Sequence, residues 1–312
     1  MTPTQTWPSV LIVVPTYRRT ALLAPLIAEI LAQCAGSEAP TRVVVIDNDP
    51  ERSAEEEAAR SGVGYLHEAT PGIAAVRQHA LDAAASDELL IMIDDDVVPE
   101  PGWLDALVGT WSDTHAAVVV GYVRYVWPDG TDPWIRAGGF MRRDHPPTGT
   151  VLQSISTGNV LFDVAQVRDL GVRFDVSLGL MGGEDLLFGR ELRAQGGLIV
   201  AAAKSVARDD VPVERTTRPF VRRRTISQGQ ARVLLLTRGG SLPRRIVGRA
   251  VHLAGGVARF LLFGTAALVA RALSDLPRNA TLRRRTWFAQ GRILGAIGRI
   301  TPEYARDGAE TS

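Results

Sequence analysis

The stretch LLIMIDDDVVPEPGWL, residues 89–104, ends an apolar run in three consecutive carboxylates. Asp94, Asp95 and Asp96 repel one another, and carboxylates at the end of a buried strand are costly to desolvate unless a cation compensates them. Because side chains alternate in extended chain, Asp94 and Asp96 can face one cavity and Asp95 another. Mg²⁺ and Mn²⁺ prefer such hard oxygen ligands and commonly bind one or two carboxylates plus substrate phosphates. The triplet therefore predicts a divalent cation and a nucleoside diphosphate; the alternative is a capping cluster for the helix after Pro99.

A second acidic pair lies in GGEDLLFGREL, residues 182–192. Gly182 and Gly183 allow a backbone conformation that places Glu184 and Asp185 at a helix N-terminus, where the helix dipole favours negative charge. Capping alone explains only one of the two acids. The other is a candidate general base, which would remove a proton from an attacking hydroxyl.

Two further polar residues lie near the ends of apolar elements. Asp47 ends the run VVVIDNDP, where it can accept hydrogen bonds from a base or a ribose, and Arg77 lies one turn inside the helix of GIAAVRQ. In the alternative interpretation these two side chains only pair with each other.

Strands and helices alternate in the N-terminal third of the chain, which indicates a mostly parallel sheet flanked by helices. Ligands of such sheets bind at the carboxyl ends of the strands. We therefore expect the polar strand ends, including Thr16, Asp47 and Asp94, to converge on one rim. The expected strands are residues 9–19, 41–50, 63–69 and 88–96, and the expected helices are 20–36, 51–62 and 71–86.

The next part of the chain returns to strands, at residues 116–127, 156–163 and 198–212, with a helix within 179–197. Residues 128–150 form a long loop rich in Gly and Pro, which marks it as functional or mobile. From about residue 216 the sequence becomes Arg-rich and helical.

The composition, with 46% hydrophobic and 22% charged residues, is typical of a globular protein. The single cysteine, Cys34, excludes an intramolecular disulfide and a cysteine-based zinc site, and we interpret it as core filling. The N-terminal stretch MTPTQTWPSV lacks the basic and apolar regions of a secretory signal, so we expect a cytoplasmic protein.

Charge is distributed unevenly along the chain. The net charge is +1, yet residues 216–312 contain 18 Arg and four acids, which leaves the remainder acidic. A basic tail of this kind predicts contact with something anionic, such as nucleic acid or a membrane surface.

Taken in order, the motifs resemble those of the inverting family-2 glycosyltransferases, which have a GT-A fold. The resemblance is closest to bacterial exopolysaccharide glucosyltransferases of the succinoglycan type, and it covers roughly residues 9 to 232. The motifs are VVPTYRR, VIDNDP, PGIAAVRQHAL, IDDDVVPEPGWL, TGNVLF, GGEDLLFGREL and DDVPVER followed by RRRTISQGQ.

The resemblance implies roles for individual residues. Asp185, of the Glu184-Asp185 pair, would be the catalytic base. Asp94 and Asp96 would form the D-x-D motif that binds the metal and the ribose-diphosphate. The residues that would contact the nucleotide sugar are Pro15, Thr16, Arg18, Asp47, Arg77, Asp94, Asp95, Arg223 and Arg224.

The sequence departs from the family pattern in three places. Gln78 follows the helix arginine, where the family often has Asn. A frequent metal-ligand histidine is absent from the late strand, where Asp209 or Asp210 stands instead, and Asp209 is the substitute we assign to it. The Q-x-x-R-W motif of processive synthases is also missing, although Arg223, Arg224 and Gln228 lie in the corresponding stretch. We therefore expect transfer of a single sugar, with the arginines offsetting diphosphate charge.

The family implies a metal-dependent hexosyltransferase that uses Mn²⁺ or Mg²⁺ and a nucleotide-sugar donor, with UDP as the expected nucleotide. The acceptor would be a sugar, a lipid-linked saccharide or a small molecule. We expect a catalytic domain over residues 9–215, with a nucleotide-sugar half (9–100) and an acceptor half (101–215), followed by a basic helical region (216–312). A homo-oligomer remains open.

The most apolar segment of the basic tail is residues 244–274. Its longest uncharged run, Phe260 to Ala270, is shorter than the roughly 20 residues that span a bilayer, so no spanning helix is expected. Flanking arginines suit a helix that lies on anionic lipid at the inner face of the membrane. The alternative is a helix that packs on the catalytic domain or on a second copy.

Rival functions lack their own motifs. A nucleotidyltransferase should have a Gly-rich phosphate loop after the first strand, and a dinucleotide oxidoreductase should have G-x-G-x-x-G there, whereas this chain has VPTYRR. A non-catalytic membrane or nucleic-acid binding protein fits the basic tail. Nucleic acid is not an expected partner, because Trp287 and Phe288 beside the arginines offer little stacking surface.

Overall fold

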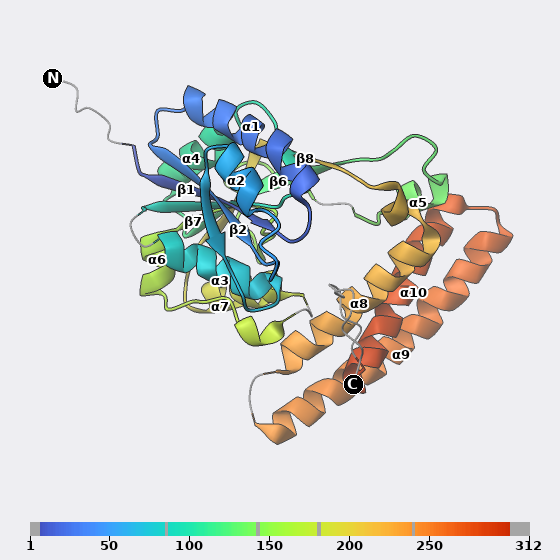
Figure 1. Ribbon diagram of the computed structural model, residues 1–312. Helices are drawn as coiled ribbons and strands as arrows, with labels where there is room; N and C mark the ends of the chain where they lie inside the picture. Colours follow the sequence, from blue (N-terminus) through green and yellow to red (C-terminus); the bar gives the residue numbers. More distant parts are fainter. Residues whose placement is uncertain (1–6, 85–86, 142–143, 180–181, 239–240, 300–312) are drawn as a thin grey trace. The chain divides into compact units, whose positions relative to one another are not determined.

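The computed structural model describes residues 7–84, 87–141, 144–179, 182–238 and 241–299 (Figure 1). The chain divides into two compact units, each described separately below. The first unit comprises residues 1–124, 143–179 and 184–209, and the second comprises residues 125–142, 180–183 and 210–312.

The first unit is built on an eight-stranded sheet of order β3-β2-β1-β4-β7-β6-β8-β5. The strands β3, β2, β1 and β4 run parallel, as predicted, because a helical crossover separates each from the next in sequence. Antiparallel pairs form between β4 and β7, β6 and β7, and β5 and β8, so the sheet as a whole is mixed. The strand bounds are β1 Val10–Thr16, β2 Thr41–Asp47, β3 Gly64–His67, β4 Leu89–Ile93, β5 Val97–Pro99, β6 Val118–Val126, β7 Asn159–Asp163 and β8 Ile199–Asp210.

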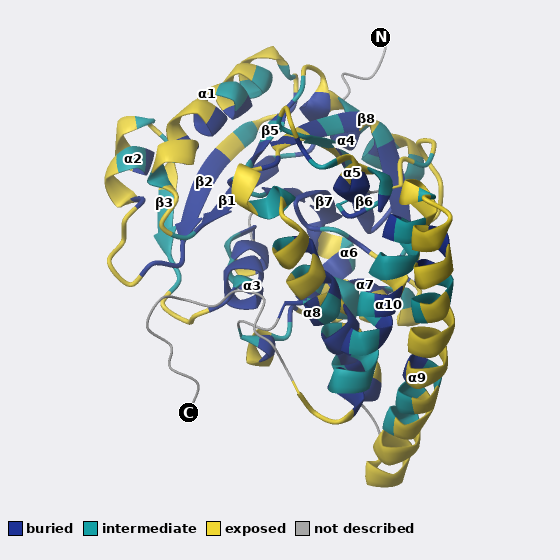
Figure 2. Cartoon of the chain, turned by 90° about the vertical axis from the view of Figure 1, so that its right-hand side faces the viewer, coloured by how far each residue is buried: buried dark blue, intermediate teal, exposed yellow. Residues whose placement is uncertain are grey.

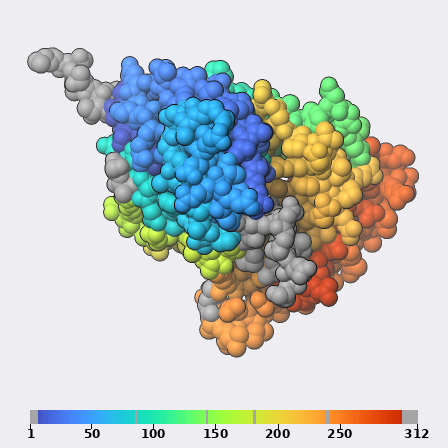
Figure 3. Space-filling view, viewed as in Figure 1, coloured from blue at the N-terminus to red at the C-terminus, as the bar shows by residue number. Residues whose placement is uncertain are grey.

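Helices cover both faces of this sheet. Those of the first unit are α1 Thr20–Gly36, α2 Glu55–Arg60, α3 Ile73–Ala83, α4 Trp103–Thr114, α6 Val164–Asp169 and α7 Glu184–Ala194. The outer surface that α1 and α2 form is continuous and drawn in two shades of blue in Figure 3. Three of these elements were not predicted from sequence: the short strand β5, the short helix α6, and α5 Pro133–Ala137 inside the expected loop.

The core of the first unit consists of the apolar runs that predicted the strands. Every residue of β1 and β4 is buried. Phe162, Phe174 and Phe188 pack together beside the sheet, with Phe174 and Phe188 stacked at 4.3 Å between ring centroids. A rigid sheet of this kind holds its strand ends at fixed positions, which is what a binding site requires.

The second unit is helical and contains α5 together with α8 Arg218–Thr237, α9 Leu242–Ala272 and α10 Leu276–Ala296. The helix α10 packs against both α8 and α9. Gly229 and Gly291 let the backbones of α8 and α10 approach closely, since a Cβ atom at either position would collide with backbone of the facing helix. A small core of Trp134, Ile135, Phe140, Val221 and Ala280 joins α5 to α8 and α10.

Much of α9 is exposed, in contrast to the other helices of the second unit (Figure 2). Its large apolar side chains include Val251, Leu261 and Leu262, each about 60% exposed. An 18-residue window of α9 has a mean hydropathy of 1.8 and is 17% buried, so by length and composition this helix could cross a membrane. No spanning helix was expected from the sequence, because the uninterrupted apolar run, Phe260 to Ala270, is too short to cross a bilayer.

Candidate active site

The carboxyl ends of β1, β2 and β4 meet at one rim of the sheet. Thr16 at the end of β1 lies in register with Asp47 at the end of β2. Its hydroxyl Oγ1 donates to Asp95 Oδ2 over 2.9 Å, which ties the end of β1 to the acidic triplet after β4. The predicted convergence of these strand ends is therefore present in the structure.

Asp95 is the buried member of the triplet, at 6% exposed. Besides Thr16, it accepts a hydrogen bond from Arg19 Nη1 at 2.7 Å. Burial raises the pKa of Asp95 to about 6, and the neighbouring Arg19 opposes that rise. Asp95 thus links Thr16 at the end of β1 to Arg19 through two hydrogen bonds at the buried side of the rim.

Asp94 and Asp96 are more open than the residue between them. Their side chains are 33% and 22% exposed, against 7% for Asp95. The sequence-based expectation of extended chain is wrong here, because the triplet forms the turn between β4 and β5, closed by a hydrogen bond from the Val97 N–H to the Asp94 carbonyl at 3.3 Å. Asp96 also accepts from Arg19 Nη1 at 3.1 Å. Asp209 lies opposite Val97, the residue that follows Asp96 in the sequence, in the β5–β8 pair.

Arg19 is a rim residue that sequence analysis missed. It contacts both Asp95 and Asp96, whereas the predicted Arg18 turns away to Asp49 at 3.1 Å and Glu51 at 3.3 Å. Arg18 has a positive φ of 52° and lies in a backbone bend between β1 and α1, and the two arginines have different partners. The sequence signal that could have identified Arg19 is the second arginine of VVPTYRR.

Arg77 connects the triplet to the acidic pair of α7. This arginine of α3 is 5% exposed. Its Nη1 donates to Glu184 Oε1, and its Nη2 donates to Asp94 Oδ1 at 3.4 Å. The guanidinium therefore bridges Asp94 and Glu184, two residues of motifs that lie about ninety positions apart in the sequence.

The two acids of α7 differ in environment. Glu184 is 3% exposed and is held by Arg77, while Asp185 is only partly buried. Asp185 Oδ1 accepts from the backbone N–H of Leu186 at 2.6 Å. Asp185 is consequently the member of the pair whose carboxylate is more accessible to a substrate.

Asp47 is fully buried at the end of β2. Its carboxylate accepts hydrogen bonds from the backbone N–H groups of Asp49 and Ala54 at 2.9 and 2.8 Å, and from the Tyr65 hydroxyl at 3.3 Å. Burial and the neighbouring Asp47 raise the pKa of Tyr65 to about 12. The alternative in which Asp47 and Arg77 pair with each other is wrong, because both residues have other partners.

The remaining predicted residues take varied positions. Pro15 is a buried residue of β1. Gln78, one of the departures from the family pattern, donates to Asp82 at 3.0 Å and accepts from the backbone of Phe174 at 2.9 Å, so it has a packing role. Arg223 and Arg224 lie on α8, in the second unit.

Carboxylates dominate the rim, which suits a hard divalent cation. Within the described ranges, no group of three or more His, Cys, Asp or Glu side chains forms a complete metal cage. A cation bound by Asp94 and Asp96 would take its other ligands from a diphosphate and water, which is the usual arrangement for Mg²⁺.

Comparison with known proteins now decides the family. The family model described as glycosyl transferase family 2 matches residues 11–169, which contain the rim and the acidic triplet. The chain belongs to glycosyltransferase family 2. The predicted enzyme class and the resemblance on which it depended are both confirmed.

One curated family-2 relative is the succinoglycan biosynthesis protein ExoM of Rhizobium meliloti strain 1021. It is 32% identical over 231 residues, which cover 71% of this chain and 73% of ExoM. The predicted likeness to succinoglycan-type enzymes is therefore also confirmed.

Solved structures of glycosyltransferases share the fold. The mannosyltransferase PcManGT from Pyrobaculum calidifontis, in complex with GDP-Man and Mn²⁺, has a TM-score of 0.61 at 18% identity, with 93% of this chain and 88% of that chain covered. GalNAc-T7 with UDP, GalNAc and Mn²⁺ has a TM-score of 0.54 at 14% identity, with 73% and 51% covered. The predicted GT-A fold with a helical C-terminal extension is thus confirmed.

Proposed function

We propose that this enzyme transfers one hexosyl group from a nucleoside-diphosphate sugar, with UDP as the nucleotide, to an acceptor hydroxyl with inversion at the anomeric carbon. The observation that carries the proposal is Arg77, which contacts Asp94 on the donor side and Glu184 beside Asp185 on the acceptor side. A donor and an acceptor bound at this rim would lie between these acids.

Asp94 and Asp96 would hold Mn²⁺ or Mg²⁺, with Asp209 as a further candidate ligand from β8. When bound, the cation stabilises the negative charge of the departing nucleoside diphosphate. Mn²⁺ in the PcManGT and GalNAc-T7 complexes supports this assignment. Arg19 keeps Asp95 and Asp96 oriented at the rim, through hydrogen bonds of 2.7 and 3.1 Å.

Asp185 would act as the general base. Its partly open carboxylate accepts the proton of the acceptor hydroxyl while the oxygen attacks the anomeric carbon of the donor. Glu184 does not compete for this role, because it is buried and paired with Arg77. A single in-line displacement, in which the acceptor oxygen forms the new bond as the nucleoside diphosphate leaves from the opposite face, inverts the anomeric configuration.

The donor nucleotide would lie along the ends of β1 and β2, bordered by Pro15, Thr16, Arg18 and Asp47. Arg77 would reach the donor from α3, and the arginines of α8, Arg223 and Arg224, would offset diphosphate charge. GalNAc-T7 is in complex with UDP and PcManGT with GDP-Man, so the two neighbours together support a nucleoside-diphosphate donor, for which we propose uridine. The name of ExoM supports a growing polysaccharide as acceptor.

The helix α9 would rest on the cytoplasmic face of an anionic membrane. Along its 31 residues it carries five arginines and no acid, and it exposes large apolar side chains such as Val251, Leu261 and Leu262. Apolar burial and electrostatic attraction to anionic lipid add together for such a helix. A membrane-resident acceptor would then reach the same surface as the enzyme.

A panel of nucleotide sugars tests the catalytic part of this proposal. The purified full chain is incubated with each donor, with Mn²⁺, Mg²⁺ or EDTA, and release of the nucleoside diphosphate is measured. We expect one UDP-sugar to be turned over with Mn²⁺ and not with EDTA. Equal turnover in EDTA would reject metal dependence, and turnover of no UDP-sugar would reject the donor.

A further inference from the structure

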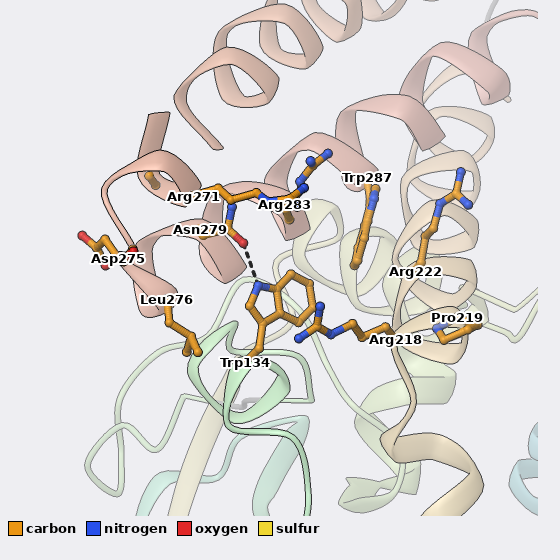
Figure 4. A pocket seen from close by; sticks show the side chains of 12 residues that line it. Trp134, Arg218, Pro219, Arg222, Arg271, Asp275, Leu276, Asn279, Arg283 and Trp287 are labelled. Carbon is orange, nitrogen blue, oxygen red and sulfur yellow. Dashed lines mark hydrogen bonds between the residues drawn. The ribbon is translucent and has the colours of Figure 1, made fainter. Parts of the chain in front are cut away.

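The second unit contains a cavity of about 670 Å³ between α5, α8, α10 and the end of α9. Figure 4 shows its lining. Four arginines surround it, together with two indole rings that face its interior, those of Trp134 and Trp287. The four arginines are Arg218, Arg222, Arg271 and Arg283.

Positive charge exceeds negative charge in the lining of this cavity, which has four arginines and one acid. Arg218 pairs with Asp132 at 2.8 Å and lies over the ring of Trp134 at 4.7 Å. Arg222, Arg271 and Arg283 make no ion pair with any residue that the structure describes. The lining acid Asp275 is engaged as the cap of α10, where its carboxylate accepts from the Arg278 backbone N–H at 3.0 Å. Like charges held together repel, so an anion with several oxygens would relieve this repulsion.

The aromatic side of the cavity is rigid. Trp134 Nε1 donates to Asn279 Oδ1 at 2.7 Å, drawn as a dashed line in Figure 4, which fixes that ring. Trp287 lies beside it, with 5.7 Å between the ring centroids and an angle of 59° between the planes. An indole presents a broad apolar face and a polar edge, which matches the C–H faces and hydroxyl rims of a sugar ring.

We propose that this cavity binds the diphosphate and the first sugar of a lipid-linked glycosyl diphosphate, which serves as the acceptor. The arginines would hold the diphosphate and the two tryptophans would hold the sugar. Ala270 and Arg271 of the lining belong to the last turn of α9, whose exposed apolar residues would lie against the lipid. As a statement about the acceptor, this inference rests on the proposed function.

Binding of inorganic pyrophosphate to the full chain tests the anion site directly. Calorimetry is carried out in EDTA and without membranes, so that cation-dependent binding at the rim is absent. We expect the R222A/R283A variant to bind pyrophosphate at least tenfold more weakly than the unmodified chain. The matched control R244A/R245A removes two exposed arginines of α9 that do not line the cavity, and it should bind as the unmodified chain does.

Unchanged binding by R222A/R283A would overturn the proposal, as would an equal loss in R244A/R245A, which would indicate non-specific attraction to a basic protein. Thermal unfolding of each variant shows whether it is folded. If R222A/R283A is not folded, the charge-preserving variant R222K/R283K replaces it, because Lys lacks the forked geometry that binds phosphate oxygens in pairs. Its affinity should then fall by a smaller but measurable factor, and full affinity would reject the site.

A second binding experiment compares the affinity for a lipid-linked ligand with the affinity for free anions. We expect a geranyl-diphosphate-linked glucose to bind at least tenfold more tightly than glucose 1-phosphate or pyrophosphate. Trp287→Ala should remove the sugar's share of that gain and leave pyrophosphate affinity unchanged. Equal affinity for all three ligands would overturn the saccharide and lipid parts. Hydrolysis of nucleotide sugars by the unmodified enzyme tests the proposed function separately, because pyrophosphate binding in EDTA does not depend on it.

Discussion

Each unit contains a cluster of charged side chains, and the two clusters differ in how many of their charges form ion pairs. At the rim of the first unit, Arg19 and Arg77 pair with the acids, and the paired groups Asp95 and Glu184 are almost fully buried. In the cavity of the second unit, three of four arginines have no ionic partner among the described residues. A compensated cluster holds a site in shape, while an uncompensated cluster favours a ligand of opposite charge.

The largest effect expected from breaking the rim is on catalysis. Replacing Asp185 by Asn removes the proposed base, so transfer should fall by about 10²- to 10⁴-fold. Donor affinity should stay nearly the same, because the metal and nucleotide contacts are elsewhere. Turnover and donor binding are measured on the same preparation, with Glu191→Gln as the control on an exposed acid of the same helix. A fully active D185N enzyme would remove Asp185 from this role.

Removing the compensating arginine should weaken folding. Arg77→Ala leaves Glu184 buried without its partner, which typically costs about 3 kcal/mol of unfolding free energy. Chemical denaturation measures the loss. Adding Glu184→Gln to Arg77→Ala removes the buried charge and should restore part of the stability. If R77A is as stable as the unmodified chain, the pair does not hold the rim together.

Binding of UDP and Mn²⁺ should stabilise the folded protein through Asp94 and Asp96, the two more exposed carboxylates of the rim. With UDP and Mn²⁺ at about one hundred times the dissociation constant, the unfolding free energy should rise by about 2.7 kcal/mol. The D94N/D96N variant should lose this gain, because both cation ligands are gone. Thermal unfolding with UDP, with and without Mn²⁺, is the measurement. A gain that D94N/D96N retains would place the cation elsewhere.

Charge on α9 should have the smallest effect. Binding to anionic vesicles of phosphatidylglycerol and phosphatidylcholine is expected in a flotation assay, and R244A/R245A should weaken it by about 2 kcal/mol, at about 1 kcal/mol per arginine. Equal flotation with neutral vesicles would reject the electrostatic contribution. Resistance to extraction at alkaline pH would show that α9 spans the bilayer instead of lying on it.

Local patterns were enough to predict the first half of the sheet. The apolar runs of β1, β2 and β4 each end in polar residues, and parallel strands bring such ends to one edge regardless of detail. The antiparallel strand β5 was missed, because its three residues leave no periodic signal. The helix α5 was missed as well, since five residues beginning at a proline look like a loop in the sequence.

Residue types and their order were sufficient to indicate the acids, the family and the basic tail, because these depend on composition and on short-range spacing. Only the tertiary structure decided how the charges are paired. Arg77 contacts Asp94 and Glu184, which are distant from it in the chain. The adjacent residues Arg18 and Arg19 have different partners. The arginine cavity likewise brings together residues that are far apart in the sequence, including Trp134 and Trp287. Such pairings depend on where folded elements meet, which no local pattern encodes.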